Sequence, residues 1–520
     1  MIKEWEKGLM RRVLNFIFSR MVIVGLLILF QLALIIGVIW KLSNYFIYFY
    51  AISILISTVA VVHLVSKQDN PSYKLAWAIP IMLFPMFGGF FYILAGNNRL
   101  GKKLTKRLEV IYYRTAPQLK QDPKIIEELE RKDKQIANQT KYIKDYALFP
   151  VHQNTTTKYL SPGERFFDSL IEELEKAEHF IFMEYFIIHE GKMWDTVLEI
   201  LERKAKAGVD VRILYDDIGS LQTLPYKYEE KIRKKGIQCV VFNPLAPVLN
   251  VILNNRDHRK ITVIDGYIGY MGGINLADEY INAIDRFGHW KDAAIMLKGD
   301  AVWNLTMMFL QTWNFSTNKY DDYEMFKPHT YHPEPFESDG YVQPYGDSPL
   351  DRETVGENVY LNLLHKSKDY VYISTPYLIV DNEMVTALSL AAKSGVDIRI
   401  VTPHKEDKWY VHIVTRAYYK QLIEAGIKIY EYTPGFIHSK TVVSDDEVAI
   451  VGSINFDYRS LYLHFECATM VYQNKTVFEV KDDYLKMLEI CTPITLEDCK
   501  NVSIWTRLMR SILRLFAPLM

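Results

Sequence analysis

The chain has 520 residues, of which 49% are hydrophobic, so it is long enough for more than one domain with its own core. Its formal net charge of -1 excludes a strongly basic protein that recruits nucleic acid through its overall field. The four cysteines have no Cys-x-x-Cys spacing and are too sparse for a disulfide framework, which favours a reducing, cytosolic setting.

The first predicted elements are apolar segments of membrane-spanning length. Residues 21–40 form a run without a charged side chain, whose length matches a hydrocarbon core about 30 Å thick. A cleaved signal peptide is the alternative, but the segment is long and lacks a small-x-small cleavage site. Residues 45–65 form a second apolar run after a short connection. We therefore predict a transmembrane hairpin within a membrane anchor that covers residues 1–100.

A third apolar stretch, residues 75–95, is broken by four residues that disfavour helix: Pro80, Pro85, Gly88 and Gly89. Basic clusters precede the first span and follow this third stretch, and both are expected in the cytoplasm, which requires an even number of crossings. We therefore predict two full spans and a third segment that is re-entrant or interfacial, with three full spans as the alternative. The protein is then a multi-pass protein of the cell membrane with the bulk of the chain, including the domains that follow, in the cytoplasm.

Residues 101–147 are charged and helix-prone, and we expect a solvated helical connector. Beyond it, apolar strands alternate with amphipathic helices, a pattern that is typical of an α/β fold. Residues 501–520 place apolar side chains at helical spacing with arginines on other faces, which predicts a C-terminal amphipathic helix. This helix either lies in the membrane interface or docks on the body of the protein.

The α/β body contains one motif twice. A His-x-Lys-x4-Asp sequence runs from His258 to Asp265 and recurs 180 residues later, from His438 to Asp445. The same offset holds for the glycine- and isoleucine-containing tails that end in Asn275 and Asn455. One copy would be weak evidence, but two copies in register indicate a duplication.

The duplication predicts two homologous α/β domains. We place the first at residues 148–330 and the second at residues 346–500. The stretch 328–349 accumulates proline, glycine and aspartate without apolar periodicity, and we expect it to link the two halves.

Each motif is expected on an apolar strand, where the histidine and the lysine two residues later share a face. If Asp265 and Gly266 form a two-residue hairpin turn, His258 lies opposite Gly273 and the tail asparagine emerges just beyond it. In the second half the same construction sets His438 opposite Ser453. Small residues opposite each histidine would leave room for a ligand.

Histidine, lysine and amide side chains at one place predict a phosphoryl-binding site. A neutral imidazole can attack phosphorus, an ammonium stabilises the anionic oxygens, and an amide donates to developing charge. A second, protonated imidazole can give its proton to the leaving alkoxide, so both halves are needed. The candidates are His258, Lys260 and Asn275 from the first half, and His438, Lys440 and Asn455 from the second. An ammonium beside each histidine argues against a metal site, and we predict neither metal nor cofactor.

The motif aspartates, Asp265 and Asp445, complete the signature but stand at the predicted turns, so a structural role is favoured over a chemical one. A catalytic histidine also needs an acceptor on its other ring nitrogen to fix its tautomer. Asp292 and Glu466 are the candidates for that orienting role.

These residues closely resemble the phospholipase D superfamily, whose signature is this duplicated motif, and within it the bacterial cardiolipin synthases. The likeness also includes these stretches: Asn70-Pro71, Glu184-Tyr185-Phe186, Thr375-Pro376-Tyr377, residues 435–438, and residues 457–460. The resemblance implies two sandwich domains that face each other across a pseudo-twofold axis, with one active site between them. One departure is His464, where the family pattern leads us to expect asparagine.

The resemblance also implies a two-step transfer. One histidine takes the phosphatidyl group from phosphatidylglycerol as a phosphohistidine and glycerol leaves; a hydroxyl of a second phosphatidylglycerol then attacks and gives cardiolipin. By analogy His258 is the nucleophile and His438 the acid and base, although the near-symmetry leaves the reverse assignment open. Expected partners are phosphatidylglycerol and membrane lipid, not nucleic acid, and the oligomeric state is not predicted.

Two other functions stay open at this stage. Transfer to water would make the protein a phospholipase D, and transfer to another alcohol would make it a different phosphatidyl transferase. A catalytically dead membrane scaffold is the alternative from another class, and the intact histidines, lysines and asparagines of both halves argue against it.

Overall fold

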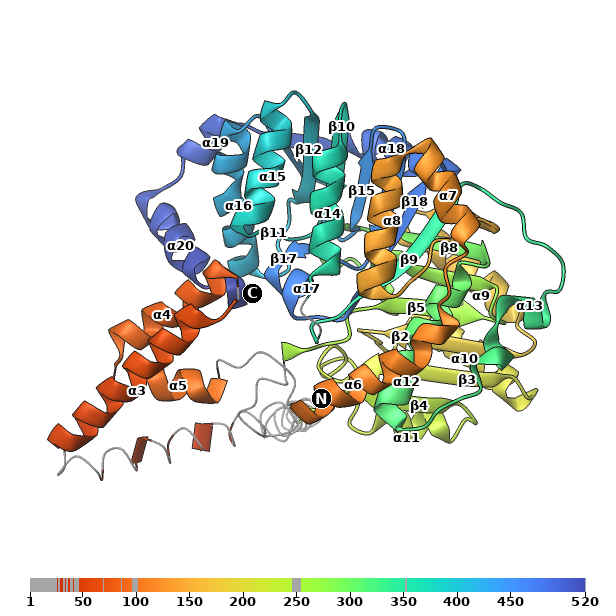
Figure 1. The fold of residues 1–520 in the computed structure, drawn as a ribbon, viewed down its shortest axis with the longest axis horizontal. Helices are drawn as coiled ribbons and strands as arrows, with labels where there is room; N and C mark the ends of the chain where they lie inside the picture. The colour runs from red at the N-terminus through yellow and green to blue at the C-terminus, as the bar shows by residue number, and fades with distance from the viewer. Residues whose placement is uncertain are drawn as a thin grey trace, which may run out of the picture. The chain divides into compact units, whose positions relative to one another are not determined.

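The computed structural model describes six continuous stretches and isolated positions between residues 26 and 41; the stretches are 46–68, 70–85, 87–95, 102–245, 254–350 and 353–519. The span predicted at residues 21–40 therefore lies outside the continuously described residues. The chain divides into two compact units, one made of residues 1–99 with 244–254 and the other of residues 100–243 with 255–520 (Figure 1).

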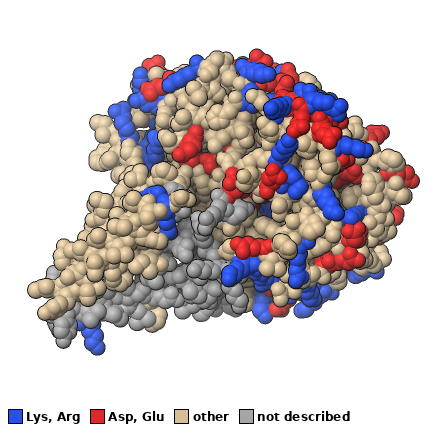
Figure 2. Space-filling view, viewed as in Figure 1, with Lys and Arg blue, Asp and Glu red and all other residues tan. Residues whose placement is uncertain are grey.

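Within its continuously described residues, the first unit has three packed helices: α3 (Phe46–Ser66), α4 (Pro71–Leu83) and α5 (Gly88–Ala95). A small buried cluster joins them, with Leu64 from α3, Trp77 and Ile81 from α4, and Tyr92 from α5. The glycine at the start of α5 permits this packing, because a Cβ atom on Gly89 would lie 2.5 Å from a side-chain atom of α3. Figure 2 shows that the surface over these helices is nearly free of charge.

One helix among the described residues, Ile47–Ser66, is long and apolar enough to cross a membrane. The third apolar stretch is broken, as α4 has 13 residues and α5 has 8. At a rise of about 1.5 Å per residue, neither covers a core roughly 30 Å thick. The second predicted span therefore corresponds to a suitable helix, whereas the hairpin with residues 21–40 stays a prediction.

The second unit contains two sheet-rich domains, which confirms the mixed α/β class. The first domain has a seven-stranded sheet. In spatial order its strands are β1 (Thr155–Leu160), β8 (Ala294–Gly299), β6 (Ile268–Gly272), β5 (Lys260–Ile264), β2 (Phe180–Tyr185), β3 (Asp210–Asp216) and β4 (Gln238–Phe242). Strands β2, β3 and β4 are parallel to one another. The central strand β2 is buried at every position, as expected for a continuous apolar run with both faces covered.

The second domain has an eight-stranded sheet. Its strands are, in spatial order, β19 (Cys491–Ile494), β13 (Lys428–Tyr432), β12 (Asp397–Pro403), β10 (Tyr370–Ser374), β15 (Thr441–Ser444), β16 (Val448–Gly452), β18 (Glu466–Tyr472) and β9 (Tyr341–Asp347). From β9 to β13 the order repeats that of the first sheet from β1 to β4, and β19 is an addition. The duplication seen in the motifs therefore extends to the whole sheet.

Helices pack on both sheets and join the two domains. Those of the first domain are α9 (Gly163–Lys176), α10 (Lys192–Lys206), α11 (Tyr228–Arg233) and α12 (Val302–Thr317). Those of the second are α14 (Val355–Lys366), α15 (Asn382–Lys393), α16 (Trp409–Glu424), α17 (Tyr458–Tyr462), α18 (Lys475–Leu488), α19 (Leu496–Lys500) and α20 (Ile504–Leu515). Helix α12 also packs on β9, and α18 also packs on β1. Each domain therefore covers an edge of the other's sheet.

Two boundaries differ from the predictions. The expected linker 328–349 contains β9, an edge strand of the second sheet, and a short helix α13 (Pro328–Tyr331). The sequence pattern does not predict this strand, because it contains Pro344 and Gly346, which are disfavoured in central strands and tolerated at an edge.

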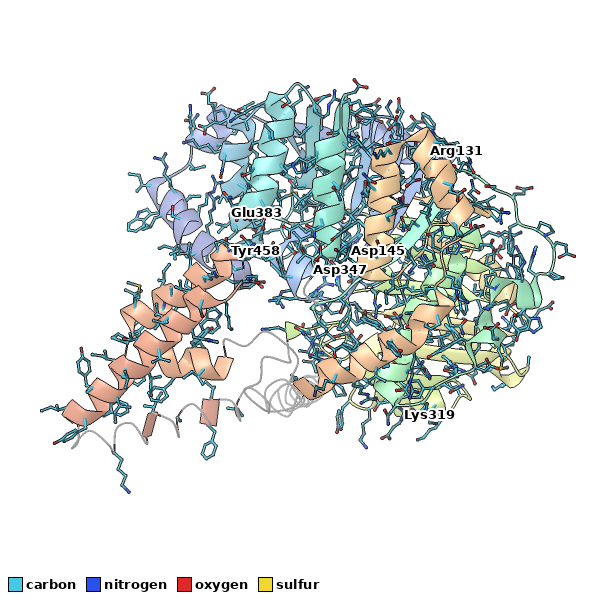
Figure 3. All side chains as sticks on the ribbon, viewed as in Figure 1. Arg131, Asp145, Lys319, Asp347, Glu383 and Tyr458 are labelled. Carbon is cyan, nitrogen blue, oxygen red and sulfur yellow. The ribbon has the colours of Figure 1, made fainter. Side chains whose placement is uncertain are left out.

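The expected solvated connector is the second difference. It forms α6 (Lys102–Thr115), α7 (Pro123–Lys132) and α8 (Lys134–Ala147), and α8 packs on β9 and α14. Figure 3 shows Asp145 of α8 and Asp347 of β9 on the same side of this domain.

The hairpin that carries each motif has a three-residue turn, not the predicted two-residue turn. In the first domain Ile264 pairs with Ile268, and in the second Ser444 pairs with Val448. The extra residue follows two residues with positive φ in each turn and shifts the register by one position.

The shifted register changes the surroundings of both histidines. The pairings predicted between His258 and Gly273, and between His438 and Ser453, are therefore wrong. Strands β5 and β15 begin after the histidines, so neither histidine belongs to its own ladder. Their backbone N–H groups bond to the opposite domain instead.

The motif aspartates hold these turns against the start of the neighbouring strand. The Asp265 carboxylate accepts hydrogen bonds of 2.8 Å from the backbone N–H groups of residues 178, 179 and 180. Asp445 accepts from residues 368, 369 and 370 at 2.8, 3.0 and 2.9 Å. Both carboxylates thus satisfy donors that the sheet ladder leaves unpaired.

We predict that Asp265→Ala lowers stability by about 3 kcal/mol, because it leaves three N–H groups beside a buried site without their acceptor. The loss should be smaller for Asp445→Ala, whose carboxylate is only partly buried. Thermal unfolding of the full chain in detergent measures both effects. A variant that unfolds at the normal temperature but has lost all turnover would indicate a chemical role for the aspartate.

Candidate active site

The two motifs meet where short segments of one domain pair with segments of the other. Strand β14 (Gly435–Ile437), just before the second motif, runs parallel to β7 (His289–Lys291) of the first domain. Asp257, just before the first motif, forms a parallel bridge with Phe465 of the second domain. The N–H of His258 then donates to the carbonyl of Phe465 at 2.9 Å. The site is therefore assembled from both domains by backbone pairing.

The same crossing brings a carboxylate to each histidine. Nδ1 of His258 lies 2.9 Å from Oε1 of Glu466, which belongs to the second domain. Nδ1 of His438 lies 2.6 Å from Oδ2 of Asp292, which belongs to the first. The carboxyl groups thus occupy the Nδ1 side of each ring and leave Nε2 as the nitrogen available for chemistry; Nζ of Lys440 also lies 2.9 Å from Nδ1 of His438.

Each motif lysine lies beside its histidine. Lys260 and Lys440 donate to the carbonyl groups of His258 and His438, two residues earlier. Burial lowers the pKa of Lys260 to about 8 and that of Lys440 to about 7. Two ammonium groups held out of water favour a bound anion, and a phosphodiester supplies one negative charge at this place.

The two histidine–carboxylate pairs differ electrostatically. Burial and the charge of Lys440 lower the pKa of His438 to about 4, and Asp292 acts in the opposite direction. Burial would raise the pKa of Asp292, but the charges of His438 and Lys440 outweigh it and keep this carboxyl ionised. The ionised Asp292 offsets part of this lowering, and a bound anionic phosphodiester adds to its effect, so His438 takes up a proton more readily once substrate is in the site.

At the other pair, burial raises the pKa of Glu466 to about 8 although Lys260 lowers it. Burial is the main cause that lowers the pKa of His258 well below its usual range, and the positive charge of Lys260 is the next. Ser453 also donates to Glu466. His258 is therefore held as the neutral imidazole, which is the form that attacks phosphorus.

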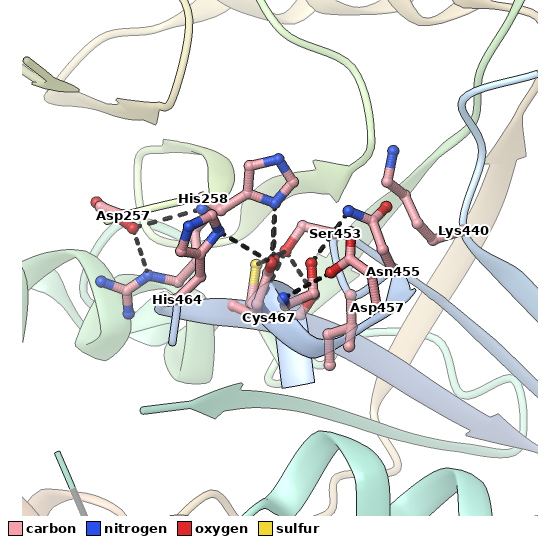
Figure 4. Close-up of polar contacts among 12 residues, drawn as sticks. Asp257, His258, Lys440, Ser453, Asn455, Asp457, His464 and Cys467 are labelled. Carbon is pink, nitrogen blue, oxygen red and sulfur yellow. Dashed lines mark hydrogen bonds and ion pairs between the residues drawn. The ribbon is translucent and has the colours of Figure 1, made fainter. Parts of the chain in front are cut away.

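A third imidazole lies against this pair. The ring centroid of His464 is 5.5 Å from that of His258, and Figure 4 shows both rings on the opposite side of Ser453 from Lys440. His464 is only 7% exposed, and neither ring nitrogen has a hydrogen-bond partner in the described protein. Burial, followed by Arg459, lowers its pKa well below the usual range. The departure from the expected asparagine thus places a neutral donor and acceptor inside the site.

One set of side chains has donor atoms spaced as in a metal site. The ligand atoms of His258, His464 and Glu466 lie within 4.8 Å of one another. A cation there would compete with the ammonium of Lys260, whose charge acts on both His258 and Glu466. The donor set therefore fits a phosphate between imidazoles and ammonium groups better than a metal ion.

The tail asparagines are tied into the protein. Oδ1 of Asn275 accepts from the N–H of Ile187 at 3.0 Å, and its Nδ2 donates to the hydroxyl of Tyr280 at 2.7 Å. Nδ2 of Asn455 donates to the hydroxyl of Ser460 at 3.0 Å. Each amide retains a second N–H that is not used in these bonds.

The predicted site residues do not include the aromatic neighbours of the histidines; Trp290 is interpreted from the sequence as a packing residue in preference to a pocket residue. Phe186 stands edge-on to His258 with centroids 4.9 Å apart. Tyr280 and Trp290 lie 5.4 and 5.3 Å from His438. No fixed spacing from the motif marks these residues, and only Phe186 lies in a stretch that carries the family resemblance.

The duplicated fold, with each motif histidine paired to a carboxyl group of the opposite domain, defines a phospholipase D-like protein. A family model described as "Cardiolipin synthase, PLD-like domain" matches residues 170–287 and 360–488. Another, "Phospholipase_D-nuclease N-terminal", matches residues 55–97. The crystal structure of phosphatidylserine synthase from Haemophilus influenzae shares the fold, with a TM-score of 0.54 and 12% identity over 73% of this chain and 97% of that chain.

Curated relatives match most of the chain. A protein described as uncharacterized from Streptococcus mutans is 43% identical over 89% of this chain and 99% of its own length. The cardiolipin synthase of Geobacillus sp. (strain WCH70) is 34% identical, over 90% of this chain and 94% of its own length. Cardiolipin synthase 2 of Bacillus anthracis is 32% identical, over 87% and 88%. The chain belongs to the cardiolipin synthase family, and the resemblance predicted from its motifs is confirmed.

Proposed function

We propose that this protein is a cardiolipin synthase, a membrane-associated phosphatidyl transferase that joins two phosphatidylglycerol molecules and releases glycerol. The family supports the reaction type. The observation that carries the proposal is the crossed pairing of His258 with Glu466 and of His438 with Asp292, which brings the two histidines close enough for the charge of one to act on the other.

In the first step, Nε2 of His258 attacks the phosphorus of phosphatidylglycerol. The bond from phosphorus to the glycerol oxygen breaks, and His438 gives its proton to the departing alkoxide. The product is a phosphatidyl group bonded to His258, a phosphohistidine. His438 is mainly neutral in the empty site, and Asp292 together with the anionic phosphodiester lets it take up the proton that it donates in this step.

In the second step, His438 takes the proton from a hydroxyl of the second phosphatidylglycerol. That oxygen attacks phosphorus, the bond to His258 breaks, and cardiolipin forms. Lys260 and Lys440 hold the non-bridging oxygens in both steps. We assign the remaining N–H groups of Asn275 and Asn455 to the same oxygens. Since one phosphodiester replaces another, no nucleotide is consumed.

The membrane anchor supports a lipid substrate. We propose that residues 21–40 and the helix Ile47–Ser66 cross the membrane as a hairpin, which keeps both domains on the cytoplasmic side. In this arrangement α4 and α5 form the predicted re-entrant or interfacial segment.

The test is incubation of the purified full chain, in vesicles, with phosphatidylglycerol labelled in its acyl chains and in its glycerol headgroup. We expect labelled cardiolipin and one free glycerol for each cardiolipin formed. A chelator should leave the rate unchanged, because the site binds phosphate through ammonium groups. Phosphatidic acid as the main product would instead identify a hydrolase, and a new phospholipid that forms in preference to cardiolipin when a second alcohol is added would identify another acceptor.

A further inference from the structure

The C-terminal helix α20 presents its apolar side away from the protein. Seven large apolar residues are exposed on the helix and the residue after it, by 38% at Met509 up to 80% at Ile504; the others are Trp505, Leu508, Ile512, Leu515 and Phe516. At about 100° per residue these positions fall within one arc of roughly 140°. A helix that belongs to a soluble surface would bury such an arc.

The polar side of α20 attaches the helix to the second domain. The guanidinium of Arg514 lies 4.4 Å from the ring centre of Tyr418 and donates to Gln421 at 3.1 Å, and both partners belong to α16. The side chains of Thr506, Arg510 and Leu513, on the side opposite the apolar arc, are partly buried. The exposed arc therefore follows from how the helix is fixed, and does not reflect a loose end of the chain.

The positive charge of α20 indicates what contacts its exposed apolar side. Helix α20 carries three arginines and no acidic residue; the arginines are Arg507, Arg510 and Arg514. Figure 2 shows basic and uncharged atoms over this part of the second domain. An exposed apolar arc with the exposed Arg507 beside it, on a helix whose charged side chains are all positive, matches a layer with acyl chains below and anionic headgroups above.

We propose that α20 is an interfacial helix that inserts its apolar arc into a bilayer with anionic lipids. The proposal concerns membrane contact by the catalytic unit itself, and it stands whichever alcohol the enzyme uses as acceptor. The helix is followed by the turn η6 (Ala517–Leu519), which packs on α17. Helix α17 leads within four residues to Glu466, the carboxylate at His258. Helix α20 is thus connected through η6 and α17 to the strand that carries Glu466.

The experiment places an environment-sensitive fluorophore on either side of α20 in the full chain. Cys239, Cys467 and Cys499 are buried, and the partly exposed Cys491 is replaced by serine. Leu508→Cys puts the fluorophore on the apolar arc, and Arg507→Cys, the neighbouring residue on another face, is the matched control. The protein is reconstituted in vesicles of phosphatidylserine and phosphatidylcholine in equal parts, with a nitroxide quencher on a fraction of the acyl chains.

We expect the fluorophore at position 508 to be quenched several-fold more than the one at position 507. Vesicles without phosphatidylserine should weaken the quenching at 508, since each arginine near an anionic surface changes the affinity by about fivefold. Water-like emission at both positions would overturn the proposal. An apolar emission at 508 without quenching by lipid would also overturn it, because a protein surface would then cover the arc.

Discussion

Replacing His258 by alanine is expected to reduce turnover of phosphatidylglycerol by at least about 10⁴-fold, because the covalent step loses its nucleophile. His438→Ala should reduce it by about 10²–10⁴-fold, the usual contribution of a general acid and base. The double variant should be no slower than His258→Ala alone, since residues that act as a unit do not contribute additively. Exposed His365 on α14 offers the control, and His365→Ala should keep normal turnover.

The two histidines can be told apart by a substrate whose leaving group needs no proton. With the p-nitrophenyl ester of a phosphatidyl group, His438→Ala should still release one nitrophenol per protein and then stop. Mass spectrometry should find the phosphatidyl group on His258, as an acid-labile adduct. A burst from His258→Ala, with the adduct on His438, would reverse the assignment. Normal steady turnover by either variant would contradict the shared site.

The largest effects after these are expected at the crossed carboxylates. Asp292→Asn and Glu466→Gln should each lower turnover by about 10²–10⁴-fold, because an amide neither fixes the same tautomer nor stabilises an imidazolium. The effect should differ between substrates. Asp292→Asn weakens His438 as an acid, so the nitrophenyl ester should restore the first step. Glu466→Gln impairs the nucleophile itself, and the same ester should not restore it.

A surface carboxylate provides the control for this pair. Glu199→Gln changes an exposed side chain on α10 and should leave both substrates unaffected. Circular dichroism of all three variants separates misfolding from lost chemistry. If Asp292→Asn and Glu466→Gln respond identically to the two substrates, the different roles assigned to His258 and His438 are wrong.

The main features of the site could be predicted from the sequence because the catalytic motif and its asparagine tail occur twice in the chain. The offset between His258 and His438 predicted two homologous domains, and the need of an imidazole for a partner singled out Asp292 and Glu466. What the sequence did not predict is that each partner comes from the opposite domain. That crossing depends on the pairing of β7 with β14 and on the bridge between Asp257 and Phe465, and segments this short carry no sequence pattern of their own.

Local geometry explains the other differences. The hairpin register was off by one because Asp265–Gly266 also permits a turn with a third residue, and periodicity does not distinguish the two. Strand β9 was mistaken for part of a linker because Pro344 is tolerated only where a sheet has an edge. The C-terminal helix could be predicted as amphipathic, but the direction of its apolar arc depends on its contact with α16.

The exchange of carboxylates between domains has a consequence for a chain that grew by duplication. Neither domain can be lost or replaced separately, because removing Glu466 of the second domain leaves His258 of the first without its carboxyl partner. During synthesis, the first domain emerges with His258 but without its acceptor. A chain that has made only its first domain therefore has a histidine without its carboxyl partner. We therefore expect activity only after β18 of the second domain has folded and brought Glu466 to His258.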